Sequence, residues 1–206
     1  MITLRPCQNK KEDALIAFSW RNDPKTIASS YIALPKSWDS FWLEYNAGYF
    51  ENPPFDPVFV MEGNEPVGFI RFEPAVLQQY PDKKIIEVMI NIAPYRRGEG
   101  IGTEALIVLQ QEMKARNVFA LMADIRKNNR ASLSTFEHAG FSFFLAKERN
   151  ILPKQKKIAV YCVIFANYNS LKNGVIDDKH PLFHSAGLRA CPEHLRFVQL
   201  FFSLRY

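Results

Sequence analysis

Hydrophobic residues recur along the chain with two different spacings. Short apolar runs bounded by polar or turn residues are typical of strands. They occur at residues 2–5, 58–61, 67–72, 85–92, 118–125, 141–149 and 158–167. Apolar residues at three- and four-residue steps are typical of helices. Two such faces are the aromatic stripe of Trp38, Phe41, Trp42, Tyr45 and Tyr49, and the spacing marked by Leu106, Leu109, Gln110 and Met113. This spacing predicts helices at residues 10–21, from 37 to about 49, from a glycine-rich segment to about 115, and at 131–139.

The order of these elements is strand, helix, helix, three strands, helix, strand, helix and two strands. That order predicts an α/β (α+β) fold with a mixed sheet. Residues 62–65 predict a hairpin turn, and Asp23-Pro24 predicts the end of the first helix. We expect one domain at residues 1–168 and a C-terminal extension at 169–206, whose role the pattern does not indicate.

Composition adds a packed core and a mild positive charge. Of the 206 residues 48% are hydrophobic and 23% are charged, with a formal net charge of +5. This excess favours anionic partners such as nucleotides or CoA. No basic stripe interleaved with aromatic residues is present, so we do not expect a nucleic-acid partner.

Three cysteines without a CxxC pair do not form a disulfide framework and indicate a reducing compartment. Residues 1–11 lack the apolar stretch of a signal peptide, and no apolar run approaches the roughly 20 residues of a membrane span. We therefore expect a cytoplasmic protein with no membrane partner.

The chemistry is concentrated at residues 97–103, between a predicted strand and a predicted helix. Gly98, Gly100 and Gly102 stand two apart, which allows a tight turn and close approach of a ligand to the backbone. The free amides and positive dipole end of the following helix suit a phosphate or pyrophosphate. Thr103 could add a hydroxyl and Arg97 a charged donor. The alternative is a glycine-rich turn without a ligand.

These residues match neither the Walker pattern GxxxxGK[ST] nor GxGxxG, but they match [RQ]xxGxG. That pattern resembles the acetyl-CoA signature of the GNAT superfamily of N-acetyltransferases. The lead-in at residues 90–96 is similar to the strand and proline that precede the signature in this family. A second similar stretch follows, with Asn129, Ser132 three residues later, and then Gly140-Phe141.

The resemblance covers about residues 1–167 and implies the GNAT fold. In that fold a mostly antiparallel sheet of six to seven strands is flanked by helices, and its fourth and fifth strands splay apart. Acetyl-CoA would be the co-substrate, with pantetheine in the gap and a β-bulge near Ile90 and Asn91 opening the splay. The positions that the resemblance assigns to CoA are Ile90, Ile92, Arg97, Gly98, Gly100, Ile101, Gly102, Thr103, Asn129, Ser132 and Phe136.

Direct transfer to a primary amine needs a neutral amine, so a general base is useful. Glu87 is the first candidate, acting through a water molecule, and Asp124 is the weaker one. The alternative for Glu87 is an exposed strand residue near the sheet edge. Phe136 stands where the family often has a tyrosine that protonates the leaving thiolate, so that proton must come from elsewhere or not be needed.

Trp20-Arg21-Asn22-Asp23-Pro24 resembles two branches of the family. One acetylates the amino group of UDP-linked amino-dideoxysugars on the way to pseudaminic or legionaminic acid, and the other acetylates ribosomal-protein N-termini or polyamines. We favour the amino-sugar nucleotide. Arg21 and Arg71 could meet a diphosphate, or could form ordinary surface ion pairs. The candidate acceptor-binding residues are Trp20, Arg21, Trp38, Trp42 and Arg71, although an aromatic stripe is more often core.

Two other hypotheses remain open. His180, His184, Cys191 and His194 have ligand-like spacing, but structural zinc usually uses paired cysteines, so we expect no metal. Phe136 and the extension would also suit a GNAT-fold protein that binds CoA or a partner without acetylating. A homodimer is compatible with the resemblance.

Overall fold

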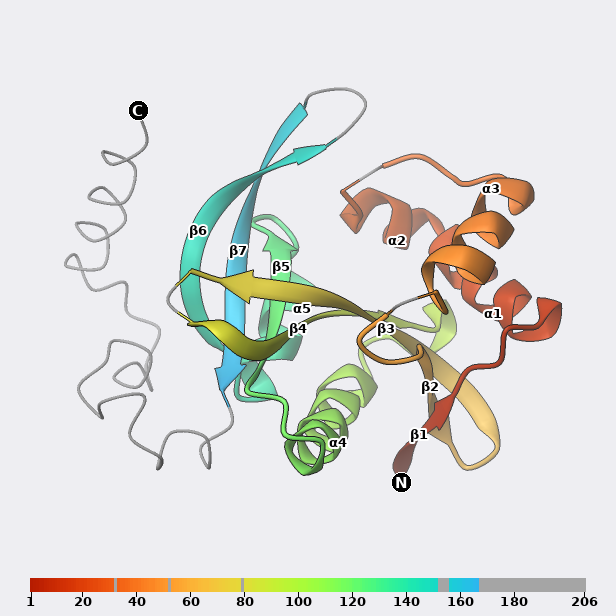
Figure 1. Ribbon diagram of the computed structural model, residues 1–206. Coiled ribbons are helices and arrows are strands. Elements are labelled where there is room, and N and C mark those ends of the chain that lie inside the picture. The colour runs from red at the N-terminus through yellow and green to blue at the C-terminus, as the bar shows by residue number, and fades with distance from the viewer. Residues whose placement is uncertain (32, 52, 79, 152–155, 167–206) are drawn as a thin grey trace.

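The computed structural model describes residues 1–166 except 32, 52, 79 and 152–155. Its centre is a seven-stranded sheet with the order β1-β2-β3-β4-β5-β7-β6 (Figure 1). The strands are β1 (Ile2–Pro6), β2 (Val58–Glu62), β3 (Glu65–Leu77), β4 (Tyr80–Ile92), β5 (Ala120–Arg126), β6 (Ser142–Ile151) and β7 (Lys156–Ala166). The predicted extension at 169–206 lies outside the described residues.

Helices pack on both faces of this sheet. They are α1 (Lys11–Arg21), α2 (Pro24–Ser29), α3 (Trp38–Leu43), α4 (Ile101–Ala115) and α5 (Arg130–His138). A π turn, η1 (Glu44–Gly48), continues α3, and a 3-10 turn, η2 (Pro94–Arg96), precedes α4. The predicted mixed, mostly antiparallel sheet is confirmed, since β4–β5 is the one parallel pair of neighbours in the described sheet.

The predicted splay is present between β4 and β5. The two strands pair only from Ile85–Ala120 to Glu87–Met122, although β4 continues to Ile92 and β5 to Arg126. Beyond Glu87, β4 stays with β3 while β5 stays with β7. The predicted β-bulge near Ile90 and Asn91 is wrong, because the β3–β4 register runs evenly there. The gap therefore comes from the divergence of two strands that keep different partners.

Helix α2 is the element that the sequence pattern missed. Asp23-Pro24 does end α1, but it also begins a new helix, with Asp23 as N-cap and Pro24 in the first turn. The Asp23 side chain accepts a hydrogen bond from Thr26 N at 3.0 Å. Aspartate at the N-cap and proline just after it are both favoured, so the same dipeptide stops one helix and starts the next.

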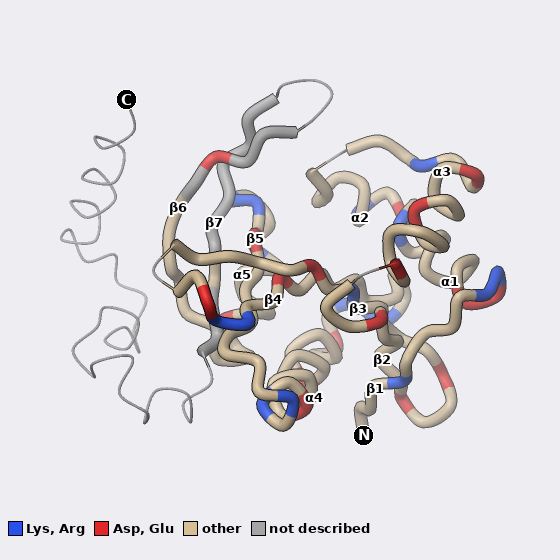
Figure 2. Tube along the Cα trace, viewed as in Figure 1, with Lys and Arg blue, Asp and Glu red and all other residues tan. Residues whose placement is uncertain are grey.

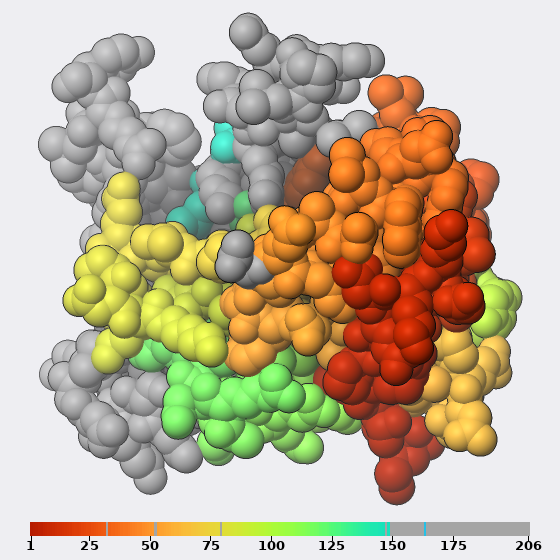
Figure 3. All heavy atoms as spheres, turned by 45° about the vertical axis from the view of Figure 1, so that its right-hand side comes forward, coloured from red at the N-terminus to blue at the C-terminus, as the bar shows by residue number. Residues whose placement is uncertain are grey.

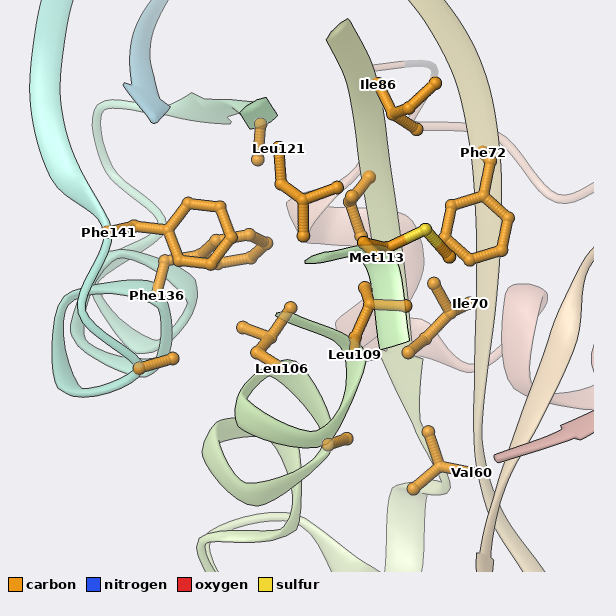
Figure 4. Close-up of a cluster of buried hydrophobic side chains, with 14 of the residues drawn as sticks. Val60, Ile70, Phe72, Ile86, Leu106, Leu109, Met113, Leu121, Phe136 and Phe141 are labelled. Carbon is orange, nitrogen blue, oxygen red and sulfur yellow. The ribbon is translucent and has the colours of Figure 1, made fainter. Parts of the chain in front are cut away.

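The main core lies between the sheet and α4. Leu106, Leu109 and Met113, which the helical spacing predicted, point from α4 toward the strands (Figure 4). They meet apolar side chains of β2, β3, β4 and β5, among them Val60, Ile70, Ile86 and Leu121. This core fixes α4, and therefore its N-terminus, against the end of β4.

The opposite face of the sheet is covered by α1, α3 and η1. Trp20, Phe41, Tyr45 and Tyr49 are buried there against β2 and β3. Figure 3 shows the orange segment of α3 and η1 between the red α1 and the yellow β3–β4 hairpin. The predicted aromatic stripe is thus largely a core face, and its predicted single helix ends as a π turn.

Candidate functional site

The gap between β4 and β5 opens into a cavity of about 410 Å³. Its walls are residues 88–91 of β4, residues 123–126 of β5, and Asn129, Ser132 and Phe136 around α5. Its remaining lining comes from α1, α2, the segment before α3, η1 and β3. The cavity therefore joins four of the predicted cofactor residues, Ile90, Asn129, Ser132 and Phe136, to the face of the sheet that carries α1 and α3, whereas the glycine loop does not line it.

The glycine-rich loop lies where β4 leads into α4. Gly98 and Gly100 have φ angles of +87° and +80°, which are left-handed values that strain any other residue. A Cβ atom added at either position would meet no atom within 4 Å, so their backbone is open to a ligand. Gly102 differs, because its Cβ would lie 3.0 Å from Thr135 Cγ2. Gly102 is needed for the packing of α4 on α5.

The first turn of α4 presents unused amides to the open side of this loop. Gly100 is the N-cap and has no side chain with which to cap the helix. The first helical hydrogen bond runs from Glu104 N to Gly100 O at 3.1 Å. The amides of Ile101, Gly102 and Thr103 consequently have no acceptor within the helix. Amides in this arrangement, at the positive end of a helix, bind phosphate groups.

The side chains of Arg97 and Thr103, which were predicted to bind the cofactor, form hydrogen bonds within the protein. The Arg97 guanidinium donates to Asp23 Oδ1 and Thr26 Oγ1, both at 2.6 Å, and its Nε donates to Ile92 O at 3.3 Å. The Thr103 hydroxyl donates to Thr135 O at 3.4 Å. These contacts hold the loop in place through side chains and do not use the amides at the start of α4.

Asn129 and Ser132 shape the far wall of the cavity. Asn129 Oδ1 accepts from Ser132 N at 3.2 Å, which caps α5. One turn later Phe136 is buried and packs edge-on against Phe141, with ring centroids 4.9 Å apart. The wall where the family often has a tyrosine hydroxyl is therefore apolar at Phe136.

Helix α2 bridges the open end of the gap. Its N-terminus is tied to the glycine loop through Asp23 and Arg97. Its C-terminal end is tied to β5, where Arg126 donates to Ala28 O at 2.9 Å and Ser30 O at 3.0 Å. Tyr31 also donates its hydroxyl hydrogen to the carbonyl oxygen of Asp124. Although partial burial opposes it, the hydrogen bonds from Arg97 and Thr26 lower the pKa of Asp23.

The two predicted general bases lie at different depths. Glu87 is buried, with 8% of its surface exposed, at the vertex where β4 and β5 still pair. The alternative of an exposed strand residue is therefore wrong. Asp124 lines the cavity two residues beyond that vertex. Of the two carboxylates, Asp124 borders the space that a substrate can enter.

The wall opposite β5 is basic. Arg21, Lys36 and Arg71 line it together with Glu44 and Tyr49. Figure 2 shows basic and acidic positions interspersed over the chain, so this local charge arises from convergence in space. Lys36 and Glu44 carry no motif and were missed in the sequence, and Tyr49 was noted there only as part of the aromatic stripe.

Trp20, Trp38 and Trp42 do not line the cavity, in contrast to Arg21 and Arg71. Trp20 is 5% exposed and meets Phe59 edge-on. Trp38 and Trp42 stack on each other, with ring centroids 5.8 Å apart, on the core beneath α3. The structure thus divides the predicted acceptor residues into a cavity pair and a core group.

Comparisons with known proteins agree with this arrangement. The family model described as acetyltransferase (GNAT) domain matches residues 1–142. No curated protein sequence matches the chain. No group of three or more potential metal ligands occurs in the described part of the chain. The same residues contain no helix with the length and apolarity to cross a membrane.

Solved structures show the same fold at low identity. The aminoglycoside acetyltransferase AAC(6')-Ib in complex with coenzyme A is 14% identical, with a TM-score of 0.65 over 84% of this chain and 98% of that one. A proposed phosphinothricin N-acetyltransferase is 23% identical, with a TM-score of 0.61 over 81% and 98%. A proposed acetyltransferase of Salmonella typhimurium, yncA, holds acetyl-CoA and is 16% identical, with a TM-score of 0.60 over 92% and 99%.

Proposed function

Because this chain belongs to the GNAT acetyltransferase domain family, we propose that it transfers the acetyl group of acetyl-CoA directly to a primary amine. The observation that carries this proposal is the position of the glycine loop at the end of the gap between β4 and β5. The amides at the start of α4 lack acceptors within the helix, and the gap opens into a cavity of about 410 Å³ that reaches the face of the sheet carrying α1 and α3.

The proposed cofactor site uses mainly backbone. The amides of Gly98, Gly100, Gly102 and Thr103 would hold the pyrophosphate, and the unpaired edge of β4 at Ile90 and Ile92 would hold pantetheine. Ile101 would begin the helix behind the phosphates, while Asn129, Ser132 and Phe136 would border the arm from α5. Arg97 would act by positioning the loop, since its guanidinium is held by Asp23 and Thr26.

The chemistry requires a proton acceptor near the amine. An amine of pKa about 10.4 is neutral in only about one molecule per few thousand at pH 7. We assign the acceptor role to Asp124, directly or through water, because it lines the cavity; Glu87 is the second candidate. The neutral amine then forms a C–N bond as the C–S bond breaks. With Phe136 in place of a tyrosine, the released thiolate takes its proton from water.

For the acceptor we favour the amino group of a UDP-linked amino-dideoxysugar. Its diphosphate would suit the basic wall that Arg21 and Arg71 help to form. Uracil stacking on Trp38 and Trp42 has less support, because neither side chain lines the cavity. Protein N-termini and polyamines are the alternative acceptors, and a CoA-binding protein without transferase activity is the alternative of another class.

A panel assay tests this proposal. The protein is incubated with acetyl-CoA and separate amino-sugar nucleotides, polyamines and N-terminal peptides, and both free thiol and acetylated product are measured. We expect acetylated amino-sugar nucleotide with one thiol released per product. Turnover of peptides alone would overturn the choice of acceptor, and CoA binding without any acetylated product would support the non-catalytic alternative.

A further inference from the structure

The acceptor end of the cavity has a local excess of positive charge. Arg21 comes from the last turn of α1, Lys36 from the segment before α3, and Arg71 from β3. The cavity lining holds four cationic side chains, these three and Arg126, against the carboxylates of Glu44 and Asp124. Arg126 is bound to carbonyl oxygens at the end of α2, whereas Arg21, Lys36 and Arg71 lie together at the acceptor end.

These three cations act on one another. Burial and then the charges of Arg21 and Arg71 lower the pKa of Lys36 to about 8, although its ion pair with Glu44 works in the opposite direction. Burial also lowers the pKa of Arg21, and Arg71 adds to that effect while Tyr49 opposes it. Like charges held together in a partly buried site are costly, and a bound anion would relieve this repulsion.

The cluster is held by specific contacts. The Asn22 amide nitrogen donates to Lys36 O at 2.8 Å, and Asn22 Oδ1 accepts from Lys36 N at 2.9 Å. This pair fixes the Lys36 backbone next to the end of α1. The Tyr49 hydroxyl donates to Glu44 at 3.0 Å, and the Glu44 carboxylate also pairs with Lys36.

Arg71 is fixed from the other side. Its guanidinium lies 5.2 Å from the Tyr49 ring centroid, and its Nη1 lies 2.9 Å from Glu73 Oε1. The stacked ring and the carboxylate restrict the guanidinium to the cavity side of β3. A fixed guanidinium loses little entropy when it binds a planar or tetrahedral anion.

A carboxylate faces this cluster across the gap. Arg71 is opposite Met89 on β4, and Glu87 is opposite Met122 on β5. Met89 and Asp124 each lie two residues beyond that last pair, so Arg71, Met89 and Asp124 follow one row on the same face. The acceptor space thus has a positive pole at β3 and a negative pole at β5.

We infer that Arg21, Lys36 and Arg71 bind an anionic group, a phosphate or a carboxylate, carried by the same acceptor whose amine lies toward Asp124. This inference rests on the proposed function, since it assigns the charge pattern to the acceptor. This charge pattern would select acceptors that carry both an amine and an anionic group. Polyamines and aminoglycosides, which carry only positive charges, would add repulsion at the positive pole.

Matched amines test the inference. We would compare glucosamine with glucosamine 6-phosphate at saturating acetyl-CoA, and expect kcat/KM to be roughly 10–100-fold higher for the phosphate, as for a charged hydrogen-bonded contact. Arg71→Met and Lys36→Met should each raise KM for the phosphate by about tenfold or more, with little change in kcat. Arg116→Met is the matched control, because Arg116 lies over the Phe55 ring, away from the cavity.

A second measurement does not need turnover. CoA-saturated protein is titrated in a calorimeter with UDP and, separately, with glutamate. The comparison shows whether the cluster binds a diphosphate or a carboxylate. We expect one of the two to bind and Arg71→Met to weaken that binding by about tenfold, with thermal unfolding showing that the variant is folded. Equal kcat/KM for both amines, or anion affinity that Arg71→Met and Arg116→Met leave equal, would overturn the inference. Absence of any acetylated amine together with Arg71-dependent anion binding would overturn the proposed function alone.

Discussion

The two parts of the site, the glycine loop and the acceptor end of the cavity, are built in different ways. At the loop before α4, one continuous segment supplies the site with its backbone, and glycines at positions 98 and 100 keep that backbone open. At the other end, side chains converge from α1, the segment before α3, η1, β3 and β5. The first end depends on local geometry, and the second depends on how distant elements pack.

The two parts of the site depend on side chains to different degrees. Solved structures with 14% to 23% identity retain the same fold over more than four fifths of this chain. A loop made of amides offers the same donors whatever side chains surround it. The acceptor end has no such protection, so its charge pattern is the informative feature of this particular chain.

Asp124→Asn should give the largest effect and should act only on the acceptor end. It keeps the side-chain shape and removes the proposed base. We expect kcat at pH 7 to fall by roughly 10²–10⁴-fold, with the loss becoming smaller at high pH as more amine is neutral. Affinity for acetyl-CoA should stay unchanged in calorimetry. Glu87→Gln is the comparison, and a pH-dependent loss there with an unaffected Asp124→Asn would transfer the role to Glu87.

Gly100→Ala should weaken CoA binding at the glycine loop. The added methyl group enters the open side of the loop, so we expect roughly tenfold weaker CoA binding, the equivalent of about 1.4 kcal/mol. Gly63→Ala is a matched control, because Gly63 also has a positive φ, +58°, and free space around its Cβ, but lies in the β2–β3 turn. Both variants should lose similar stability in urea, about 1 kcal/mol. If both bind CoA as the unaltered protein does, the loop is not the phosphate site.

The sequence predicted most of the fold because its periodic segments are long. The α4 spacing identified Leu106, Leu109 and Met113 correctly as a buried face. Strand ends were harder, and β3 and β4 extend well beyond the predicted 67–72 and 85–92. The pattern stopped early partly because Pro74 interrupts it. In the described pairs β2 reaches β3 only as far as Ile70, so Pro74 lies in a stretch with a neighbour on one side.

The site was predictable in proportion to how local it is. Gly98 and Gly100 could be recognised from their spacing alone, and their open, left-handed backbone agrees with that reading. The role of Asn22 could not, since its partner Lys36 is 14 residues away and has no pattern around it. Arg97 illustrates a third case, in which the right residue was singled out but its partners, Asp23 and Thr26, come from a helix that was not predicted.

Asp23→Ala tests whether the two ends are mechanically linked. The change removes the N-cap of α2 and the partner of Arg97 at once. We expect unfolding in urea to show a loss of about 1–2 kcal/mol, as for other N-cap removals. Because α2 also contacts β5, KM should rise by a factor of roughly two to five for acetyl-CoA and for the acceptor alike, within the range of that lost energy. A rise confined to one substrate would show that the ends are independent.

Phe136→Tyr should have the smallest effect, and it examines a position where this chain departs from the resemblance. Phe136 lines the cavity and is 2% exposed, so a hydroxyl added there would lie in a largely apolar wall. If the thiolate, whose thiol has a pKa near 8.5, leaves without assistance, a new proton donor adds little. We therefore expect kcat to change less than about threefold and the pH profile to keep its shape. A tenfold or larger rise in kcat would show that protonation of the leaving group is limiting, and that the missing hydroxyl is a real cost to this enzyme.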